Sequence, residues 1–556
     1  MRILSAAEMQ ACDRATTERF GVSSLELMRA ASAAVADCAR THFPHARRVT
    51  VLCGRGNNGG DGMMTARLLA DAGLDVTTLL LGSPDGLKGD AAEAWRELTS
   101  PLHGQVHVII APEDLKQHKF ALASDLLPHL IIDALLGTGF KPPLKGLALA
   151  ALDWIQSDPA LAHVPILAVD LPSGWPADET SATLESPVFS ADAVVTFTAP
   201  KPAHVFGRLT RRWHQPVVVA PIGSPEEAIV SSLNLEWAGS ATELTHAPRA
   251  SAANKGNFGH VLVVGGSFGS AGGKAGAPAM TALAALRAGA GLVTAAVPAP
   301  ALAPVSSLAP ELMTWPLEAT AEGCVAESNL APTRLAAYTA GKTVLALGPG
   351  LGQSPETAKF VLGLLASTQV SAVVDADALN ILAAGPAHLA DLSRNGTRTV
   401  VLTPHPGEMA RLAGTTVAAI QANRLQTARA FAQRHRVTLV LKGARTLIAH
   451  PDGRLAVNTT GNPGMAKGGS GDLLTGLIAG LLAQYPAHPA PAVEAAVYLH
   501  GLSADFAVRA RDEHTLLATD TLDFLSQAFR FYSRRANGYV CIQGLPPDAA
   551  PREAAS

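Results

Sequence analysis

Short apolar runs alternate with amphipathic segments along the first part of the chain. The runs with the length and composition of buried strands lie at 47–53, 75–82, 129–137, 164–174 and 191–200. Between the first two runs, residues 63–73 show a helical pattern that ends at a glycine. Alternation of strand-like and helix-like segments is typical of βαβ units, whose strands join a parallel sheet. The first part of the chain is therefore expected to be an α/β domain.

A second α/β series follows a stretch that has no clear period. Residues 221–250 mix proline, serine and charged residues, and we expect the domain junction there. Further β-rich runs lie at 259–267, 342–350, 370–377, 397–408 and 437–444, with helical patterns at 276–289 and 422–435 and a buried core helix at 473–483. The sequence thus predicts one domain at 1–226, a second α/β domain at 232–540 and a disordered tail at 545–556.

The composition of the chain limits which binding partners and which cell compartment can be expected. The 556 residues are too many for one ordinary core, which agrees with two domains. Lys and Arg number 43 against 46 Asp and Glu, so the net charge of -3 gives no reason to expect nucleic acid or an anionic membrane as a partner. The five cysteines include no CxxC pair, and the chain begins without a signal-peptide pattern. These features argue against a zinc site or a disulfide framework and predict a cytoplasmic protein.

Polar residues follow three strand-like runs of the first half, and ligands of open parallel sheets gather at strand carboxyl ends. The motif GRGNNGGDG (54–62) contains GxGxxG, which is typical of dinucleotide binding but also of any tight strand-to-helix turn. DALLGTGFKPP (133–143) and VDLPSGW (169–175) end the other two runs. Their acids and hydroxyl groups could converge on a hard cation or act in proton transfer. A turn cap is the structural alternative for the VDLPSGW residues.

The second half carries an acid inside a glycine-rich helix start. Asp472 lies in GGSGDLLTG (468–476), where backbone N–H groups attract anions. We expect the helix dipole to keep this carboxylate ionised, so that it can accept a proton from a substrate hydroxyl while glycine N–H groups stabilise a transferred phosphoryl group. The alternative is that Asp472 only caps the helix.

Further polar groups end the other strands of this half. Lys442 follows a strand and could neutralise a nucleotide phosphate, and LGPGLG (347–352) allows close backbone approach to a ligand. His405 is held between two prolines, where substrate contact is a better expectation than acid–base work. Asp375 and Asp377 either bind magnesium or form hydrogen bonds that close a turn.

The three first-half loops, in this order, resemble the signature of the NAD(P)H-hydrate epimerase family over about residues 1–225. The resemblance implies a Rossmann-like domain that interconverts the R and S epimers of hydrated NADH or NADPH. It assigns Asp170 as the catalytic carboxylate and a potassium ion to Asn58, Asp133 and Ser173. The implied substrate-binding residues are Asn57, Asn58, Gly59, Gly60, Asp61, Gly137, Thr138, Gly139, Phe140, Lys141, Pro142, Pro143 and Asp170.

The second half resembles the ribokinase-like ADP-dependent NAD(P)H-hydrate dehydratases through GGSGDLLTG, LKGART, LGPGLG, VVDADALN, TPHPGE and GNPGMAKGG. The resemblance implies removal of water from the S epimer at the expense of ADP with Mg²⁺, with Asp472 as catalytic residue. The implied hydrate-binding residues are Ala277, Gly350, Gly352, His405 and Asp472. The implied nucleotide-binding residues are Lys442, Gly443, Ala444, Arg445, Thr446 and Gly471.

Together the resemblances imply a bifunctional repair enzyme that binds hydrated NAD(P)H and ADP, or ATP in its place, and forms a homo-oligomer. One enzymatic alternative is a small-molecule kinase of the ribokinase superfamily with an accessory dinucleotide-binding domain, which would leave a stable phosphorylated product. A non-catalytic dinucleotide-binding module is the other alternative. It predicts that substitution of Asp170 or Asp472 changes no activity.

Overall fold

The computed structural model divides the chain into two compact units. It describes all residues except 102, 118–126, 271, 393–397 and 546–556. The first unit comprises Met1–Leu233 together with the chain from Tyr532 onward, and the second comprises Asn234–Phe531. The junction thus falls inside the expected stretch, but the C-terminal boundary differs from the expected one, because residues after Phe531 return to the first unit. The expected disordered tail, apart from Leu545, lies outside the described residues.

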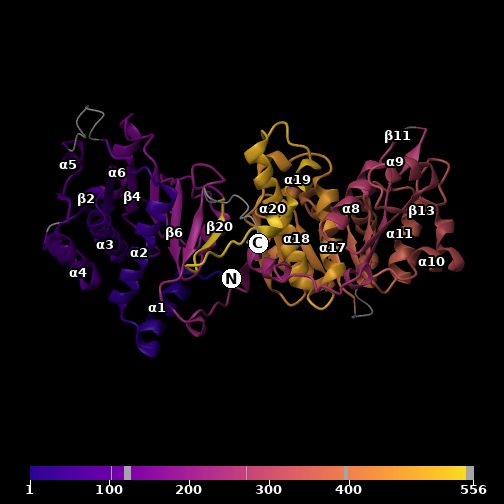
Figure 1. The fold of residues 1–556 in the computed structure, drawn as a ribbon, viewed down its shortest axis with the longest axis horizontal. Helices are drawn as coiled ribbons and strands as arrows, with labels where there is room; N and C mark the ends of the chain where they lie inside the picture. The colour runs from indigo at the N-terminus through magenta and orange to yellow at the C-terminus, as the bar shows by residue number, and fades with distance from the viewer. Residues whose placement is uncertain (102, 118–126, 271, 393–397, 546–556) are drawn as a thin grey trace. The chain divides into compact units, whose positions relative to one another are not determined.

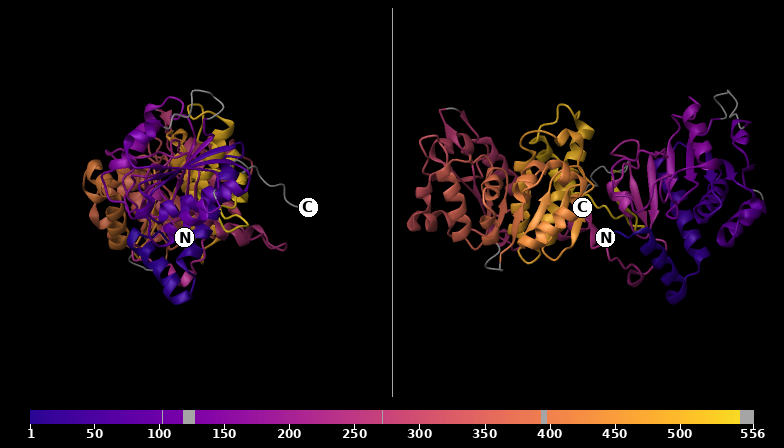
Figure 2. Two further views of the ribbon diagram at one scale, coloured as in Figure 1. Left: turned by 90° about the vertical axis from the view of Figure 1, so that its left-hand side faces the viewer. Right: turned by 180° about the vertical axis from the view of Figure 1, so that it is seen from behind.

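The first unit is built on a sheet of eight strands in the order β20-β7-β6-β5-β4-β1-β2-β3. The strands are β1 (Arg48–Cys53), β2 (Asp75–Leu81), β3 (Gln105–Ile109), β4 (Leu130–Ala134), β5 (Ile166–Val169), β6 (Ala193–Phe197), β7 (Val217–Ala220) and β20 (Val540–Gln543). The helices are α1 (Ala6–Phe20), α2 (Ser24–His42), α3 (Asn57–Asp71), α4 (Gly89–Thr99), α5 (Pro112–Gln117), α6 (Gly146–Ser157) and α7 (Pro202–Phe206). All neighbouring strands are parallel except β20, which pairs antiparallel with β7. Figures 1 and 2 show this yellow strand within the violet sheet of the first unit.

The second unit contains a sheet of ten strands in the order β13-β12-β9-β14-β15-β16-β17-β18-β19-β8. These are β8 (Leu235–Trp237), β9 (His260–Val264), β12 (Leu292–Pro298), β13 (Met313–Leu317), β14 (Val344–Leu347), β15 (Ser371–Val374), β16 (Val400–Leu402), β17 (Thr438–Leu441), β18 (Leu447–Ala449) and β19 (Leu455–Val457); β10 (Phe268–Gly269) and β11 (Gly272–Gly273) form a separate ribbon. Only the pairs β17–β18 and β18–β19 of this sheet are antiparallel. Mostly parallel strands explain the nearly continuous apolar runs, since such sheets are covered on both faces.

Helices cover the second sheet, and α17 (Ser470–Gln484) is buried over most of its length. They are α8 (Gly276–Arg287), α9 (Leu302–Ser306), α10 (Pro332–Thr339), α11 (Pro355–Ser367), α12 (Asp377–Ala383), α13 (Pro386–Asp391), α14 (Pro406–Ala413), α15 (Val417–Ala422), α16 (Arg424–His435), α17 (Ser470–Gln484), α18 (Pro489–Ala510), α19 (Asp520–Asp523) and α20 (Leu525–Arg530). Helix α17 packs against α8, α18 and the strands β9, β14 and β15. A Cβ at Gly476 would lie 2.1 Å from the Thr281 carbonyl oxygen of α8, so glycine permits this close helix crossing.

The helix after β1 begins earlier than its sequence pattern indicates. Residues 57–61, expected to form a loop before a helix at 63–73, are the first turns of α3. Glycine is a poor helix former, but here it lets the helix start pack against the preceding turn. A Cβ added at Gly59 would lie 1.8 Å from the Gly54 carbonyl oxygen, and one at Gly54 would lie 2.1 Å from the Leu135 carbonyl oxygen. This packing fixes the start of α3 at the carboxyl ends of β1 and β4.

We predict that Gly59→Ala lowers the free energy of unfolding of the first unit by about 2–3 kcal/mol, because the new methyl group overlaps a backbone carbonyl that cannot move aside. Gly56→Ala is the matched control, since a Cβ there meets nothing within 4 Å. It should cost less than about 1 kcal/mol as a helix N-cap change. Denaturant unfolding measures both variants, and equal stability of the two would contradict the packing argument.

Candidate active sites

A cavity of about 1210 Å³ opens at the strand ends of the first unit. Its lining comes from α1, the β1–α3 turn, the loop after β4 and the end of β5. The predicted substrate-binding residues among the lining are Asn57, Asn58, Asp61, Gly137, Thr138, Gly139, Phe140 and Asp170. The other predicted residues are not part of this lining: Gly59 and Gly60 are buried in packing contacts, and Lys141, Pro142 and Pro143 are exposed.

Asp170 lies at the end of β5 in an unusual backbone conformation, with φ of 63°. Its Oδ1 accepts hydrogen bonds from Thr196 Oγ1 at 2.8 Å and from Lys201 Nζ at 2.9 Å, and its Oδ2 accepts one from the Thr138 N–H at 3.2 Å. A non-glycine residue with positive φ is strained, and such strain is found at functional sites. The contacts are with side chains and backbone of other strand ends, so Asp170 does more than cap its own turn.

The charge state of Asp170 is set by competition between burial and a lysine. Burial acts to raise its pKa, but the Lys201 ammonium group, with His204 and the hydrogen bonds, outweighs burial and lowers the pKa below its usual value. His204 donates from Nε2 to the Asp170 carbonyl at 2.6 Å and accepts the Lys201 N–H at Nδ1. Burial lowers the pKa of His204 to about 4, so this imidazole is neutral at neutral pH. Asp170 is thus an ionised carboxylate.

Asp133 and Ser173 are held together beside this carboxylate. Asp133 Oδ1 accepts the Ser173 hydroxyl at 2.6 Å and Asp133 Oδ2 accepts the Ser173 N–H at 2.7 Å. Ser173 Oγ also accepts the Leu136 N–H at 3.0 Å. Asn58 approaches from α3: a Cβ at Gly137 would lie 3.2 Å from Asn58 Oδ1, and Asn58 Nδ2 is buried without a hydrogen-bond partner. The loop after β4 therefore contacts both Asn58 and the Asp133–Ser173 pair, and of the three predicted potassium ligands only Asn58 is part of the cavity lining.

Sequence reasoning missed two charged residues of this cavity. Lys201 follows β6 in the run TFTAPKP and is almost fully buried, and Asp13 lies on α1. The position of Lys201 soon after an apolar strand could have identified it as a site residue, as the same kind of position identified Lys442. Asp13 carried no local signal, because one acid in an amphipathic helix is ordinarily solvated.

We predict that Lys201→Met destabilises the first unit by about 3–5 kcal/mol at pH 7, because it leaves Asp170 as a buried carboxylate without its cation. In the native protein the lowered pKa of Asp170 contributes stability above the unfolded pKa, near 4, and this contribution is lost as the pH falls through the folded pKa. The difference between variant and native protein should therefore shrink in acid. Denaturant unfolding from pH 7 downward measures it, and a constant difference would contradict the assignment.

In the second unit, Asp472 lies in the first turn of α17, three residues after the N-cap Gly469. Within the described part of the chain its carboxylate accepts no hydrogen bond and forms no cap. Burial and the neighbouring Asp375 raise its pKa to about 6, although Lys442 and Lys274 act in the opposite direction. Burial and Asp375 thus outweigh the helix dipole, and with a pKa of about 6 the carboxyl is still mostly ionised at pH 7.

Lys442 and Asp375 form the fixed charge pair next to Asp472. Lys442 Nζ donates to Asp375 Oδ1 at 2.8 Å, and Thr475 Oγ1, on α17, donates to Asp375 Oδ2 at 2.9 Å. Glu408 Oε2 lies 4.0 Å from Lys442 Nζ. A Cβ at Gly471 would lie 3.4 Å from Lys442 Nζ, so the ammonium group sits at the helix N-terminus. A cation and free backbone N–H groups at a helix start are the groups that anion sites use.

The glycine loop after β14 lies beside the start of α8. Gly350 has φ of 72°, and a Cβ there would meet Lys274 and, at 3.3 Å, the Cβ of Ala277. Asp377 Oδ2 accepts the Gly352 N–H at 2.9 Å and thereby fixes the loop. The two aspartates of VVDADALN thus form hydrogen bonds and ion pairs within the protein.

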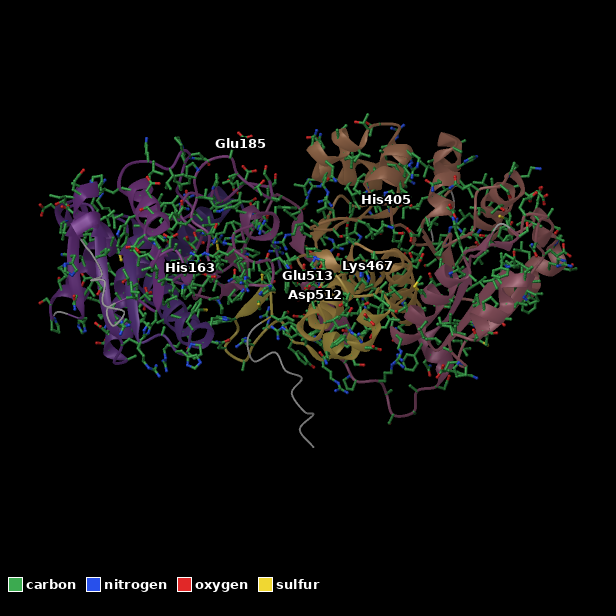
Figure 3. All side chains as sticks on the ribbon, turned by 90° about the horizontal axis from the view of Figure 1, so that it is seen from above. His163, Glu185, His405, Lys467, Asp512 and Glu513 are labelled. Carbon is green, nitrogen blue, oxygen red and sulfur yellow. The ribbon has the colours of Figure 1, made fainter. Side chains whose placement is uncertain are left out.

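His405 is the N-cap of α14 and not a residue of an open loop. Its Nδ1 accepts the N–H groups of Gly407 and Glu408, and its Nε2 lies 3.5 Å from Glu408 Oε1. About half of its side chain is exposed. Figure 3 shows His405 and Lys467, of the GNPGMAKGG motif, on the side of the second unit that faces the viewer. The position agrees with a ligand contact.

The turn between β17 and β18 presents the remaining predicted nucleotide-binding residues. Arg424 Nη1 donates to the Ala444 carbonyl at 2.6 Å and holds the turn. Gly443 and Ala444 are exposed, and Thr446 Oγ1 donates to the Gly443 carbonyl. The Arg445 guanidinium is turned inward, where Nη1 donates to the Thr459 carbonyl at 3.0 Å. The turn therefore offers backbone groups and Lys442, while Arg445 stabilises it from within.

Within the described ranges, no three His, Cys, Asp or Glu side chains are grouped to hold a metal ion. Among the residues that the structure describes, none of the helices combines the length and apolar character that a membrane crossing requires.

Two family models match the chain, one in each unit. The model described as YjeF-related protein N-terminus matches residues 24–203, and the model described as NAD(P)H-hydrate dehydratase matches residues 261–527. A bifunctional NAD(P)H-hydrate repair enzyme from Moorella thermoacetica is 41% identical over 538 residues, which cover 95% of this chain and 97% of the relative. The corresponding enzyme from Escherichia coli is 37% identical over 531 residues, covering 94% and 93%. The ADP/ATP-dependent NAD(P)H-hydrate dehydratase from Bacillus subtilis, co-crystallised with ATP/Mg²⁺, is 31% identical with a TM-score of 0.44, covering 53% of this chain and 97% of that one.

Proposed function

Since the chain belongs to the family of bifunctional NAD(P)H-hydrate repair enzymes, we propose that Asp170 and Asp472 are the reacting carboxylates of its two activities. The protein is an NAD(P)H-hydrate epimerase and an NAD(P)H-hydrate dehydratase on one chain. In hydrated NAD(P)H the hydroxyl group stands on the ring carbon bonded to nitrogen. Epimerisation inverts this carbon, and dehydration removes its hydroxyl group.

The observation that carries the dehydratase assignment is the unpartnered carboxylate of Asp472 beside Lys442 and Gly471. The substrate hydroxyl oxygen attacks the terminal phosphorus of the nucleotide, and Asp472 takes the hydroxyl proton. The phosphorylated oxygen then leaves as inorganic phosphate while the ring nitrogen lone pair forms the iminium ion. Loss of a proton from the adjacent carbon restores the double bond. A general base works best with a pKa near the operating pH, which suits a carboxyl at about 6.

The nucleotide is assigned to the anion site at the start of α17. Lys442 and the Gly471 N–H face the phosphates, and the exposed turn of Gly443, Ala444 and Thr446 contacts the rest of ADP. Arg445 supports this turn from inside. The Mg²⁺ ion enters with the nucleotide and neutralises phosphate charge. The hydrate lies against Ala277, Gly350, Gly352, His405 and Asp472.

Potassium is assigned to Asn58, Asp133 and Ser173 in the first unit. These residues fit a hard cation, since they offer carboxylate, amide and hydroxyl oxygens and Asp133 is fully buried with no cationic partner among the described residues. A bound K⁺ would supply positive charge next to the substrate. Homo-oligomer formation and a cytoplasmic location remain predictions, which light scattering and cell fractionation test.

We predict that Asp472→Asn abolishes nucleotide-dependent recovery of NAD(P)H absorbance from both epimers, with a loss of at least about 10²-fold, since the base is removed without a change in shape. Asp170→Asn is the matched control: it should leave recovery from the S epimer unchanged and slow the R epimer to its spontaneous rate. Full turnover by Asp472→Asn would exclude the base assignment. Stoichiometric release of AMP and phosphate tests ADP as the nucleotide.

The pH dependence of dehydration follows from the pKa of Asp472. Asp472 must be ionised to accept a proton, so kcat/KM should fall about tenfold per pH unit below about 6. Recovery of NADH from the purified S epimer at saturating ADP measures the profile, and nucleotide affinity at each pH serves as the control. A profile flat down to pH 4.5 would mean that Asp472 does not take the proton.

A further inference from the structure

We propose that Asp13 is a second catalytic residue of epimerisation, which exchanges a proton with the substrate hydroxyl or water while Asp170 acts on the other face of the ring. The inference deepens the epimerase function and rests on the proposed role of Asp170. Nothing in the sequence pattern or in the family resemblance singles out Asp13.

Asp13 comes from α1 and lines the same cavity as Asp170. Its Oδ1 is buried and has no hydrogen-bond partner, although most buried carboxylate oxygens are satisfied. Its charge interacts with Lys201 and Asp170, which places it close to the strand ends that hold the reacting group. Asp13 therefore borders the cavity as a residue, while its Oδ1 is covered by protein and lacks a hydrogen-bond partner there.

The environments of the two carboxyl groups push their protonation apart. Lys201 lowers the pKa of Asp170, whereas burial raises the pKa of Asp13 and the Asp170 charge adds to that rise. Two carboxyl groups in one cavity whose pKa values are pushed apart are typical of an acid–base pair. The groups that face Asp13 are Arg14 on its own helix and Lys201, Asp170 and Asp61 from other elements.

Inversion at the ring carbon requires such a pair. The carbon–oxygen bond breaks with its electron pair on oxygen, a carboxylic acid supplies the proton that makes the leaving group water, and the ring nitrogen lone pair forms the iminium ion. Water then adds to the opposite face and gives its proton to a carboxylate. The carboxyl that donated the proton, Asp13, therefore ends ionised, and Asp170 ends protonated. The reverse reaction uses the same two groups in exchanged roles.

Asp61 also lines the cavity and is a weaker candidate for this role. Burial and three neighbouring acids, Asp170, Asp13 and Asp90, all raise its pKa, and no cation opposes them. Asp61 is therefore held protonated and cannot readily serve as the base. At Asp13 the charges of Lys201 and Arg14 act against burial, which makes it the better candidate.

The test is the pH profile of epimerisation, measured on the full chain with nucleotide omitted so that dehydration is idle. Each purified epimer is followed chromatographically toward equilibrium. Native kcat/KM should be bell-shaped, because one carboxyl must be ionised and the other protonated. Asp13→Asn should lower kcat/KM by about 10²–10⁴-fold in both directions and abolish the alkaline limb. Asp13→Glu, which keeps the acid, should retain both limbs.

Asp37→Asn on α2 removes the same charge at an exposed position and should leave rate and profile unchanged. Native-like rates for Asp13→Asn, or a slow variant with both limbs intact, would overturn the role of Asp13. Loss of the alkaline limb in Asp61→Asn with Asp13→Asn unaffected would transfer the role to Asp61. If Asp170→Asn epimerises at the native rate, the failure lies instead in the proposed function of Asp170.

Discussion

A lysine paired with a buried aspartate stands at the strand ends of each sheet, and the charge balance of each site depends on that pair. Lys201 Nζ lies 2.9 Å from Asp170 Oδ1 in the first unit, and Lys442 Nζ lies 2.8 Å from Asp375 Oδ1 in the second. A buried pair adds little net stability, but removal of one partner leaves an uncompensated charge. In each unit the proposed reacting group, the glycine turns and the proposed ligand contacts surround the lysine ammonium group, whose position is fixed by its aspartate partner.

The two units use this pair differently. In the first unit the paired aspartate is itself the proposed reacting group, and the lysine lowers the pKa of Asp170 in a cavity where burial alone would raise it. In the second unit the paired Asp375 binds Lys442 and Thr475 and leaves Asp472 unpaired. Asp375 then acts on Asp472 as a nearby like charge. The lysine of the first unit lowers the pKa of Asp170, whereas the aspartate of the second unit's pair raises the pKa of Asp472.

The sequence predicts the strands whose apolar runs are long, and it predicts the residues at their ends. The run at 437–444 matches β17 (Thr438–Leu441) and correctly precedes Lys442. Prediction from the sequence fails where a structural feature depends on residues far apart in the chain or on packing. Strand β20 has only four residues, and nothing in them specifies pairing with β7 across more than 300 positions. The early start of α3 depends on glycine contacts with Gly54, which helix propensity opposes. Asp13 becomes a site candidate only once α1 is placed against the cavity.

The pKa of Asp472 depends on burial and on a neighbouring like charge, and neither is visible in the sequence. A helix N-terminus stabilises a carboxylate by about 0.3–1 kcal/mol, which lowers its pKa by less than one unit. Transfer of the same group into a site shared with Asp375 raises the pKa from 3.8 to about 6, a cost of about 3 kcal/mol to the ionised form. Burial and like charge therefore outweigh the dipole. The dipole and the backbone N–H groups remain available to a phosphate, so the proposed anion site and the proposed base can coexist in one turn because they act on different groups.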